Sequence, residues 1–148
     1  MDNGVAWELM HSVESSVSPE FAWEFMTDVA NWDDPPARFS LQGPFSDGST
    51  GTTLVPGQEP RHWTIRAVIP GSSYTVEMGL EGAVLSFVWR FEALSESRGT
   101  RISQRIALSG SNAASYVEQV RPVFESTLGP GMDRIVSLMQ QHPGACGN

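Results

Sequence analysis

The sequence predicts an α+β domain in which a curved antiparallel sheet of seven strands packs on a long C-terminal helix. Three observations lead to this prediction. An alternating apolar segment opens the chain, short runs separated by turn residues fill its middle, and an apolar stripe at helical spacing ends it. The chain has 148 residues, and a domain of that size buries roughly 70% of the surface that its unfolded chain exposes. We therefore expect one domain over residues 1–148, built around one core.

The first predicted elements are a strand and two short helices. Residues 5–17 alternate between apolar and polar side chains, which is the period of a half-buried strand. Ser18 is a favourable N-cap and Pro19 suits the first helical position, so a short amphipathic helix is predicted over residues 19–29. The segment 31–36 ends this helical region, because a residue that precedes proline disfavours helical backbone angles.

The middle of the chain predicts a meander of six strands over residues 38–43, 50–55, 61–69, 73–80, 83–93 and 100–109. Turn pairs such as Asp47-Gly48, Pro70-Gly71 and Arg98-Gly99 separate these strands. One face is expected to be apolar and carries Trp63, Ile65, Ala67, Tyr74, Val76, Met78, Leu85, Phe87, Trp89, Phe91, Ile102, Gln104, Ile106 and Leu108. The other face carries side chains of mixed charge, which predicts cross-strand ion pairs in solvent.

The C-terminal segment predicts a long helix over residues 113–141, because apolar residues recur at helical spacing from Tyr116 to Met139. Gly129-Pro130-Gly131 is expected to kink or split this helix. At about 1.5 Å per residue the helix is roughly 40 Å long, enough to cross the sheet. Since a sheet with one apolar face needs cover on that face alone, we expect the helix to lie there.

Composition excludes several classes of function. The chain has 9 basic and 17 acidic residues and a net charge of −8, which opposes binding to nucleic acid and to anionic membranes. No apolar stretch approaches the ~18–20 residues that span a bilayer, and no secretory leader pattern opens the chain, so we expect a cytoplasmic protein. The single cysteine, Cys146, has no second cysteine with which to form an intramolecular disulfide.

Several local motifs carry a family resemblance. They are the segment from Ser12 to Trp32, the glycines Gly43, Gly48 and Gly51, the run Gly99-Thr100-Arg101-Ile102, and Met132-Asp133-Arg134. With the order strand, helix pair, meander and long helix, they resemble the superfamily of START, birch-pollen-allergen and polyketide cyclase/dehydrase domains. This resemblance implies a helix-grip fold over a cavity and the binding or processing of hydrophobic molecules such as lipids, quinones, polyketides or plant hormones. For a few members it implies action on chaperones.

Two polar residues interrupt the apolar inner face. His11 lies between Leu9 and Val13 on that face, and its imidazole titrates near neutral pH, which suits a general acid or base. A core histidine with satisfied hydrogen bonds is the structural alternative. Gln104 lies between Ile102 and Ile106, where its amide could bind a ligand oxygen or form a structural hydrogen bond to a neighbouring strand or to His11.

Aromatic residues supply the other candidates for ligand binding. Tyr74 and Tyr116 each combine an apolar ring with a hydroxyl, which suits a pocket wall that orients one polar group, although a rim position is the alternative. The bulk of the expected cavity wall comes from large apolar side chains, which could equally be ordinary core: Trp63, Met78, Phe87, Trp89 and Phe124.

The sequence predicts no metal and no cofactor. Asp33 and Asp34 lack accompanying oxygen ligands and are expected in turn or cap roles, while His11, His62 and His142 fit no zinc spacing. The chain contains no nucleophile elbow, no Walker loop and no dinucleotide fingerprint.

Three functions follow as hypotheses. The first is binding of a hydrophobic or aromatic small molecule in a cavity between the sheet and the C-terminal helix. The second is a polyketide aromatase/cyclase or dehydrase that uses His11 as acid or base. The third is a chaperone-interacting module without ligand, which predicts a sizeable exposed apolar patch. A homodimer is left open.

Overall fold

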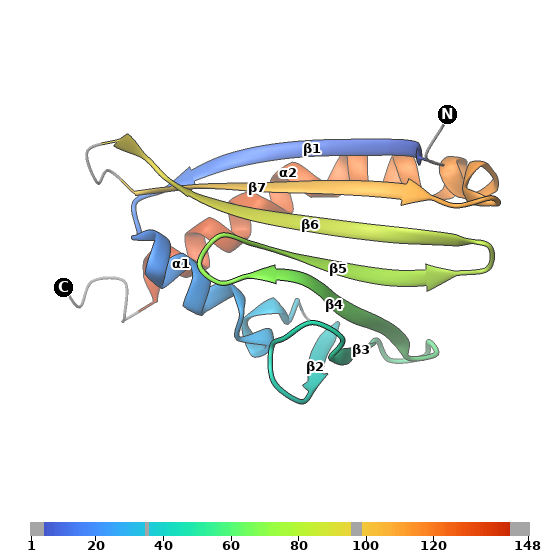
Figure 1. Ribbon diagram of the computed structural model, residues 1–148, viewed down its shortest axis with the longest axis horizontal. Helices are drawn as coiled ribbons and strands as arrows, with labels where there is room; N and C mark the ends of the chain where they lie inside the picture. The colour runs from blue at the N-terminus through green and yellow to red at the C-terminus, as the bar shows by residue number, and fades with distance from the viewer. Residues whose placement is uncertain (1–4, 35, 96–98, 143–148) are drawn as a thin grey trace.

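One antiparallel sheet of seven strands dominates the computed structural model, which describes residues 5–34, 36–95 and 99–142 (Figure 1). The strands lie in the order β1-β7-β6-β5-β4-β3-β2. Their bounds are β1 (Val5–Ser15), β2 (Arg38–Gln42), β3 (Thr50–Leu54), β4 (Arg61–Ile69), β5 (Ser73–Leu80), β6 (Ala83–Ala93) and β7 (Thr100–Ser109). The predicted fold class is confirmed. Arg98 and Cys146 lie outside the described residues.

The helices cover the inner face and one end of the sheet. In Figure 1, α2 (Val117–Gln141) runs behind the sheet along β1, β7 and β6, and α1 (Pro19–Met26) closes the end where β1 finishes. The 3-10 turn η3 (Ala113–Tyr116) leads into α2. No helix within the described residues is long and apolar enough to cross a membrane.

The predicted helix over residues 19–29 is shorter in the structure. It begins as expected, because the Ser18 hydroxyl accepts a hydrogen bond from the Phe21 N–H at 3.1 Å. It ends at Met26, since the Thr27 hydroxyl donates to the Trp23 carbonyl and Asp28 caps a new 3-10 turn, η1 (Val29–Trp32), by accepting from the Ala30 N–H. The second of the two expected N-terminal helices is therefore this 3-10 turn.

Gly129-Pro130-Gly131 was expected to kink or split the C-terminal helix. The split is wrong, because α2 is continuous through Pro130, and the kink stays a prediction. Gly129 and Gly131 both keep negative backbone φ angles. Proline removes one helical hydrogen bond, but α2 buries Leu128 on one side of Pro130 and Met132 and Met139 on the other. Tertiary packing on both sides therefore outweighs the local break signal.

The predicted inner face is buried as expected in most positions, and Ala67 is the exception. The register between β4 and β5 shifts between Arg66 and Ile69, and Ala67 has a φ of 54° and is exposed. The Asp47 carboxylate accepts hydrogen bonds from the N–H groups of Ala67 and Val68 at 2.9 and 2.8 Å. This β-bulge turns Ala67 outward and places Val68 against the core instead.

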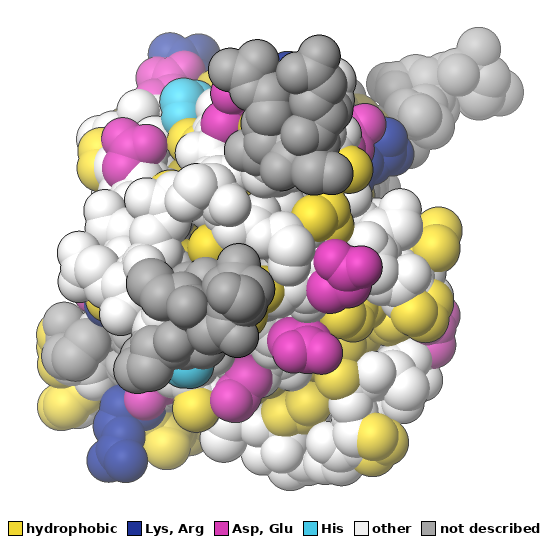
Figure 2. Space-filling view, turned by 90° about the vertical axis from the view of Figure 1, so that its left-hand side faces the viewer, with side chains coloured by type: hydrophobic (Ala, Val, Ile, Leu, Met, Phe, Trp, Pro, Cys, Tyr) yellow, Lys and Arg dark blue, Asp and Glu magenta, His cyan; other side chains and the backbone are white. Residues whose placement is uncertain are grey.

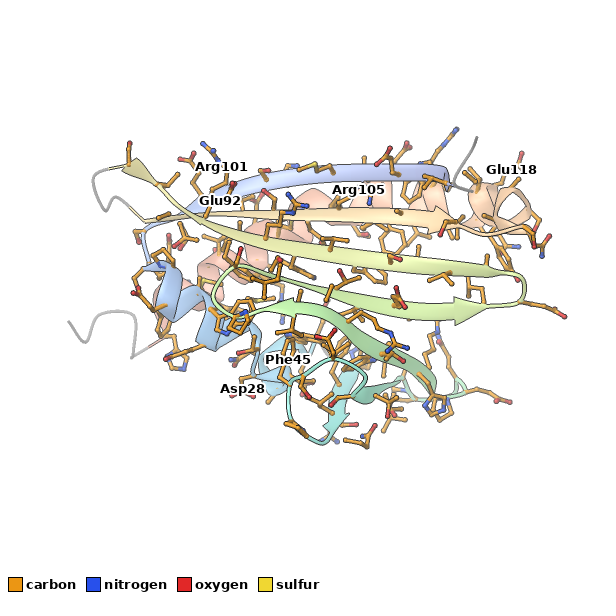
Figure 3. The ribbon with its side chains drawn as sticks, in the orientation of Figure 1. Asp28, Phe45, Glu92, Arg101, Arg105 and Glu118 are labelled. Atoms are coloured by element: carbon orange, nitrogen blue, oxygen red, sulfur yellow. The ribbon has the colours of Figure 1, made fainter. Side chains whose placement is uncertain are left out.

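The outer face of the sheet carries the predicted cross-strand ion pairs. Arg105 Nε lies 2.6 Å from a Glu8 carboxylate oxygen, and Arg101 lies 3.1 Å from Glu14. Figure 3 shows Arg101, Arg105 and Glu92 on the face turned away from α2. Because these side chains are half exposed to water, each pair contributes less than about 1 kcal/mol. The charged side chains of the outer face therefore pair with one another in solvent.

Candidate functional site

A cavity of about 440 Å³ lies between the inner face of the sheet and α2. Its volume falls within the ~300–1,000 Å³ of ligand pockets. Strand β1 contributes nothing to its walls. They come from α1, η1, the other six strands, the segment between η1 and β2, and α2: Met26, Trp32, Asp34, Ala37, Phe39, Thr53, Arg61, Trp63, Val76, Met78, Leu85, Phe87, Trp89, Gln104, Ile106, Phe124, Thr127, Leu128, Gly131, Met132, Arg134 and Ile135.

Two tryptophans on one side of the cavity are held in fixed positions by their indole N–H groups. Trp63 donates to the Thr53 hydroxyl at 3.0 Å, and Trp32 donates to the Met26 carbonyl at 2.7 Å. Their ring centroids are 5.3 Å apart. Because both polar handles are used within the protein, the rings offer the cavity rigid apolar surface. Such a wall suits a flat hydrophobic or aromatic molecule.

Gln104 is the polar exception in the cavity wall. Only 9% of its surface is exposed, and its neighbours across β7 are His11 on β1 and Trp89 on β6. Within the part of the chain that the structure describes, its side chain makes no hydrogen bond, including none to His11. Among the described residues only the Tyr74 hydroxyl is fully buried without a partner, so the amide atoms of Gln104 are accessible from the cavity. The amide, with two N–H donors and one acceptor, is thus available to a ligand.

His11 lies outside the cavity. Its side chain is on the predicted face, turned toward α2, where a Cβ at Gly129 would lie 3.7 Å from two of its ring atoms. However, β1 is the edge strand, and α2 packs directly over it, so the cavity begins one strand further in, at β7. The imidazole is exposed to solvent. His11 was expected on the concave face as a ligand-binding residue or general acid or base; it lies on that face, but beside the cavity and not in its wall.

Tyr74 is fully buried but does not line the cavity either. Aromatic rings enclose it, among them Trp32, stacked at a centroid distance of 6.2 Å, and Phe45 at 4.9 Å. Its hydroxyl is the one buried side-chain oxygen or nitrogen without a hydrogen-bond partner among the described residues. Burial raises the pKa of this hydroxyl well above its ordinary value of 10.0. At neutral pH Tyr74 is therefore an uncharged core residue, separated from any molecule in the cavity.

The Tyr74→Phe variant is expected to be as stable as the wild type or more stable. Removing a buried hydroxyl that has no partner relieves a penalty of about 1 kcal/mol, which raises Tm by about 2–4 °C in a chain of this size. Thermal unfolding followed by circular dichroism measures the shift. A loss of stability would show that the hydroxyl has a partner, such as a buried water molecule, that stabilises it.

Tyr116 lies at the opposite end of the sheet from α1. Its hydroxyl donates to the Glu81 carbonyl at 3.0 Å, which ties η3 to the turn between β5 and β6. It does not line the cavity. The remaining sequence candidates do: Trp63, Met78, Phe87, Trp89, Gln104 and Phe124.

Three charged residues lie at the opening of the cavity, and none of them was expected in its wall: Asp34, Arg61 and Arg134. Arg61 shares strand parity with Trp63 and Ile65, so alternation assigns it to the inner face, although its charge is equally typical of a surface residue. Arg134 extends from α2 and donates to the Asp33 carbonyl at 3.2 Å. Nothing in the local pattern around Asp34 indicated that it would lie beside Arg134.

The acidic residues of this region take part in turn structure. Asp33 accepts a hydrogen bond from the Phe39 N–H at 2.8 Å, and Asp34 forms an isolated backbone bridge with Ala37. The described residues contain no group of three or more histidine, cysteine, aspartate or glutamate side chains arranged to hold a metal ion.

A curved seven-stranded sheet that grips one long helix over an aromatic cavity defines a helix-grip domain. The chain belongs to the family described as polyketide cyclase / dehydrase and lipid transport, whose sequence profile matches residues 6–140. Membership of this family supports a role in ligand binding or cyclisation without naming a ligand. No curated protein sequence matches the chain significantly.

Solved structures show the same fold at low sequence identity. Norcoclaurine synthase from Thalictrum flavum aligns with a TM-score of 0.72 at 16% identity and covers 96% of this chain and 99% of its own. A protein from Nitrosomonas europaea aligns with a TM-score of 0.70 at 15% identity, covering 95% and 97%. The two-domain aromatase/cyclase StfQ of the steffimycin pathway aligns at 0.65 and 11%, covering 93% of this chain and 50% of that protein.

Proposed function

We propose that this protein binds a hydrophobic or aromatic small molecule in the cavity between the sheet and α2. The observation that supports this most strongly is the unpaired amide of Gln104 in a cavity whose other walls are mainly apolar. An apolar cavity of about 440 Å³ suits a hydrophobic molecule. The Gln104 amide faces this cavity and has no partner in the part of the protein that the structure describes, so a bound molecule with an oxygen or hydroxyl group can form a hydrogen bond with it.

Binding is favoured over catalysis by the chemistry of the walls. An aromatase/cyclase or dehydrase that works by proton transfer needs an acid or base within hydrogen-bond reach of the reacting atoms. Among the residues that line the cavity, only Asp34, Arg61 and Arg134 ionise, and all three lie at the opening. The chain also contains no lysine, so imine chemistry on a lysine side chain is excluded. A cyclase in this cavity would act mainly by folding its substrate.

A chaperone-interacting surface has less support. The large apolar side chains that are most exposed are Met10, Leu54, Ile69, Val123 and Leu138. They belong to four different elements, and the two on α2 are separated by about 22 Å along the helix axis. Scattered exposed apolar residues of this kind are normal on a soluble surface.

Native mass spectrometry of the freshly purified protein tests the proposal directly. A small molecule retained under native conditions and released by denaturing extraction is the expected result. A preparation that retains nothing and binds none of a panel of aromatic compounds would contradict the proposed function.

The Gln104→Leu variant tests the role of the amide. We expect wild-type protein to bind naphthol more tightly than methylnaphthalene, because only naphthol has a hydroxyl for Gln104. In the variant this preference should fall by about two- to tenfold, the usual contribution of one hydrogen bond. Competition against a fluorescent probe measures both affinities. Gln58→Leu, at an exposed turn position, is the matched control and should leave the preference unchanged.

A further inference from the structure

We infer that the molecule bound in this cavity carries an anionic group, such as a carboxylate, which Arg61 and Arg134 recognise at the opening. This inference rests on the proposed function and names the chemical class of its ligand. The expected ligand is amphipathic, with aromatic or other apolar atoms inside the cavity and its charge at the opening.

The first residue that supports this inference is Arg61, because its guanidinium is unpaired among the described residues and lies at the cavity. It begins β4, lines the cavity and is exposed to solvent at the opening. Five of the nine arginines form ion pairs within the described residues, those at positions 66, 101, 105, 121 and 134. In that part of the chain Arg61 makes no ion pair and no side-chain hydrogen bond. Its guanidinium therefore has all its N–H donors available to a ligand.

Arg134 is the second residue that supports this inference, and contacts within the protein fix its guanidinium more firmly than that of Arg61. One terminal nitrogen, Nη2, donates to the Asp33 carbonyl at 3.2 Å and lies 3.8 Å from an Asp34 carboxylate oxygen. The Asp34 contact is too long for a hydrogen bond. Both contacts use the same nitrogen, so the other edge of the guanidinium stays available. A planar guanidinium held at one nitrogen is well suited to bind a carboxylate with the remaining donors.

The charge at the opening contrasts with the rest of the protein. Two arginines and one aspartate are the ionisable residues that line the cavity, whereas the whole chain carries a net charge of −8. Figure 2 shows acidic side chains spread over the end of the molecule where α1 lies. A local excess of positive charge on an acidic protein is not explained by general solubility. Two arginines beside an apolar cavity favour ligands that place an anion there.

Two fluorescent probes with the same rings separate the effect of charge from that of shape. Anilinonaphthalene sulfonate carries a negative charge, and phenylnaphthylamine is its neutral counterpart. We expect Arg61→Gln to weaken binding of the anionic probe by about three- to tenfold. Binding of the neutral probe should change by less than twofold. Added salt should weaken binding of the anionic probe more than that of the neutral one.

Matched variants control for net charge and for local structure. Arg90→Gln removes one positive charge from the outer face, where Arg90 is exposed and distant from the cavity walls, so it should leave both probes unaffected. Arg61→Lys should restore part of the affinity for the anionic probe. Arg134→Gln should act in the same direction as Arg61→Gln, with a loss of stability measured separately by thermal unfolding.

The possible results are distinct. If Arg61→Gln and Arg134→Gln both leave the affinity for the anionic probe unchanged, or weaken both probes equally, the anion site is refuted while binding in the cavity stands. If wild-type protein binds neither probe, the proposed function fails and this inference fails with it.

Discussion

The Gly51→Val variant is expected to lose about 3 kcal/mol or more of its unfolding free energy. Gly51 on β3 pairs with Trp63 on β4, and the Trp63 indole lies flat across the glycine. A Cβ at position 51 would overlap the six-membered ring of Trp63. The ring is only 3% exposed and its N–H is bonded to Thr53, so it cannot move aside without losing packing and a hydrogen bond. Overpacking of a core at this scale costs about 1–3 kcal/mol, and more where the neighbour is fixed.

Chemical denaturation followed by circular dichroism measures this loss. Thr50→Val, at the neighbouring exposed position of the same strand, adds the same residue without the clash and should cost less than about 0.5 kcal/mol. In a Trp63→Leu background, Gly51→Val should lower the free energy of unfolding by less than it does in the wild-type background. If Gly51→Val proves as harmless as Thr50→Val, the placement of Trp63 over β3 is wrong.

The strands could be predicted because their limits are set locally. The predicted strands over residues 73–80 and 83–93 coincide with β5 and β6. Gly71 and Gly82 before them have φ angles of 78° and 73°, which glycine adopts far more readily than other residues. Alternation between two such turns then assigns each side chain to a face. Both signals are contained within a few neighbouring residues.

Two of the departures from the predicted fold have non-local causes. Ala67 left the inner face because a carboxylate twenty positions earlier, Asp47, binds the backbone of the bulge. Nothing in the run from Arg61 to Ile69 reveals that contact. Helix α2 stayed continuous because it buries residues on both sides of Pro130. Local sequence rules describe how much proline destabilises a helix, but the stabilisation from packing depends on the sheet against which α2 lies.

The cavity could be predicted only in part, because alternation gives the face of a side chain and not its place along the sheet. His11, Tyr74 and Gln104 all have the parity of the inner face. Gln104 faces the cavity from β7, the second strand of the sheet, whereas α2 covers β1 beside His11, and aromatic rings of the core enclose Tyr74. Arg61 has the same parity but is charged, so alternation alone did not distinguish it from a surface residue.

Opposite the sheet, Gly131 on α2 offers the sharpest test that the cavity is the binding site. Gly131 borders the cavity, and a Cβ added there meets no atom within 4 Å. A leucine at this position would extend into the space at the opening. The Gly131→Leu variant is therefore expected to weaken binding of phenylnaphthylamine at least tenfold, roughly 1.4 kcal/mol.

The same substitution should not harm the fold, which makes its effect on binding interpretable. Glycine inside a helix is about 0.8–1.0 kcal/mol less favourable than alanine, and leucine is close to alanine on that scale. Thermal stability should therefore be equal to or higher than that of the wild type.

Gly79→Leu is the matched control, because Gly79 lies on the outer face of β5, also with open space at its Cβ. It should leave probe binding unchanged. Wild-type affinity in Gly131→Leu would mean that the probe binds elsewhere, since a filled opening and an occupied cavity exclude each other.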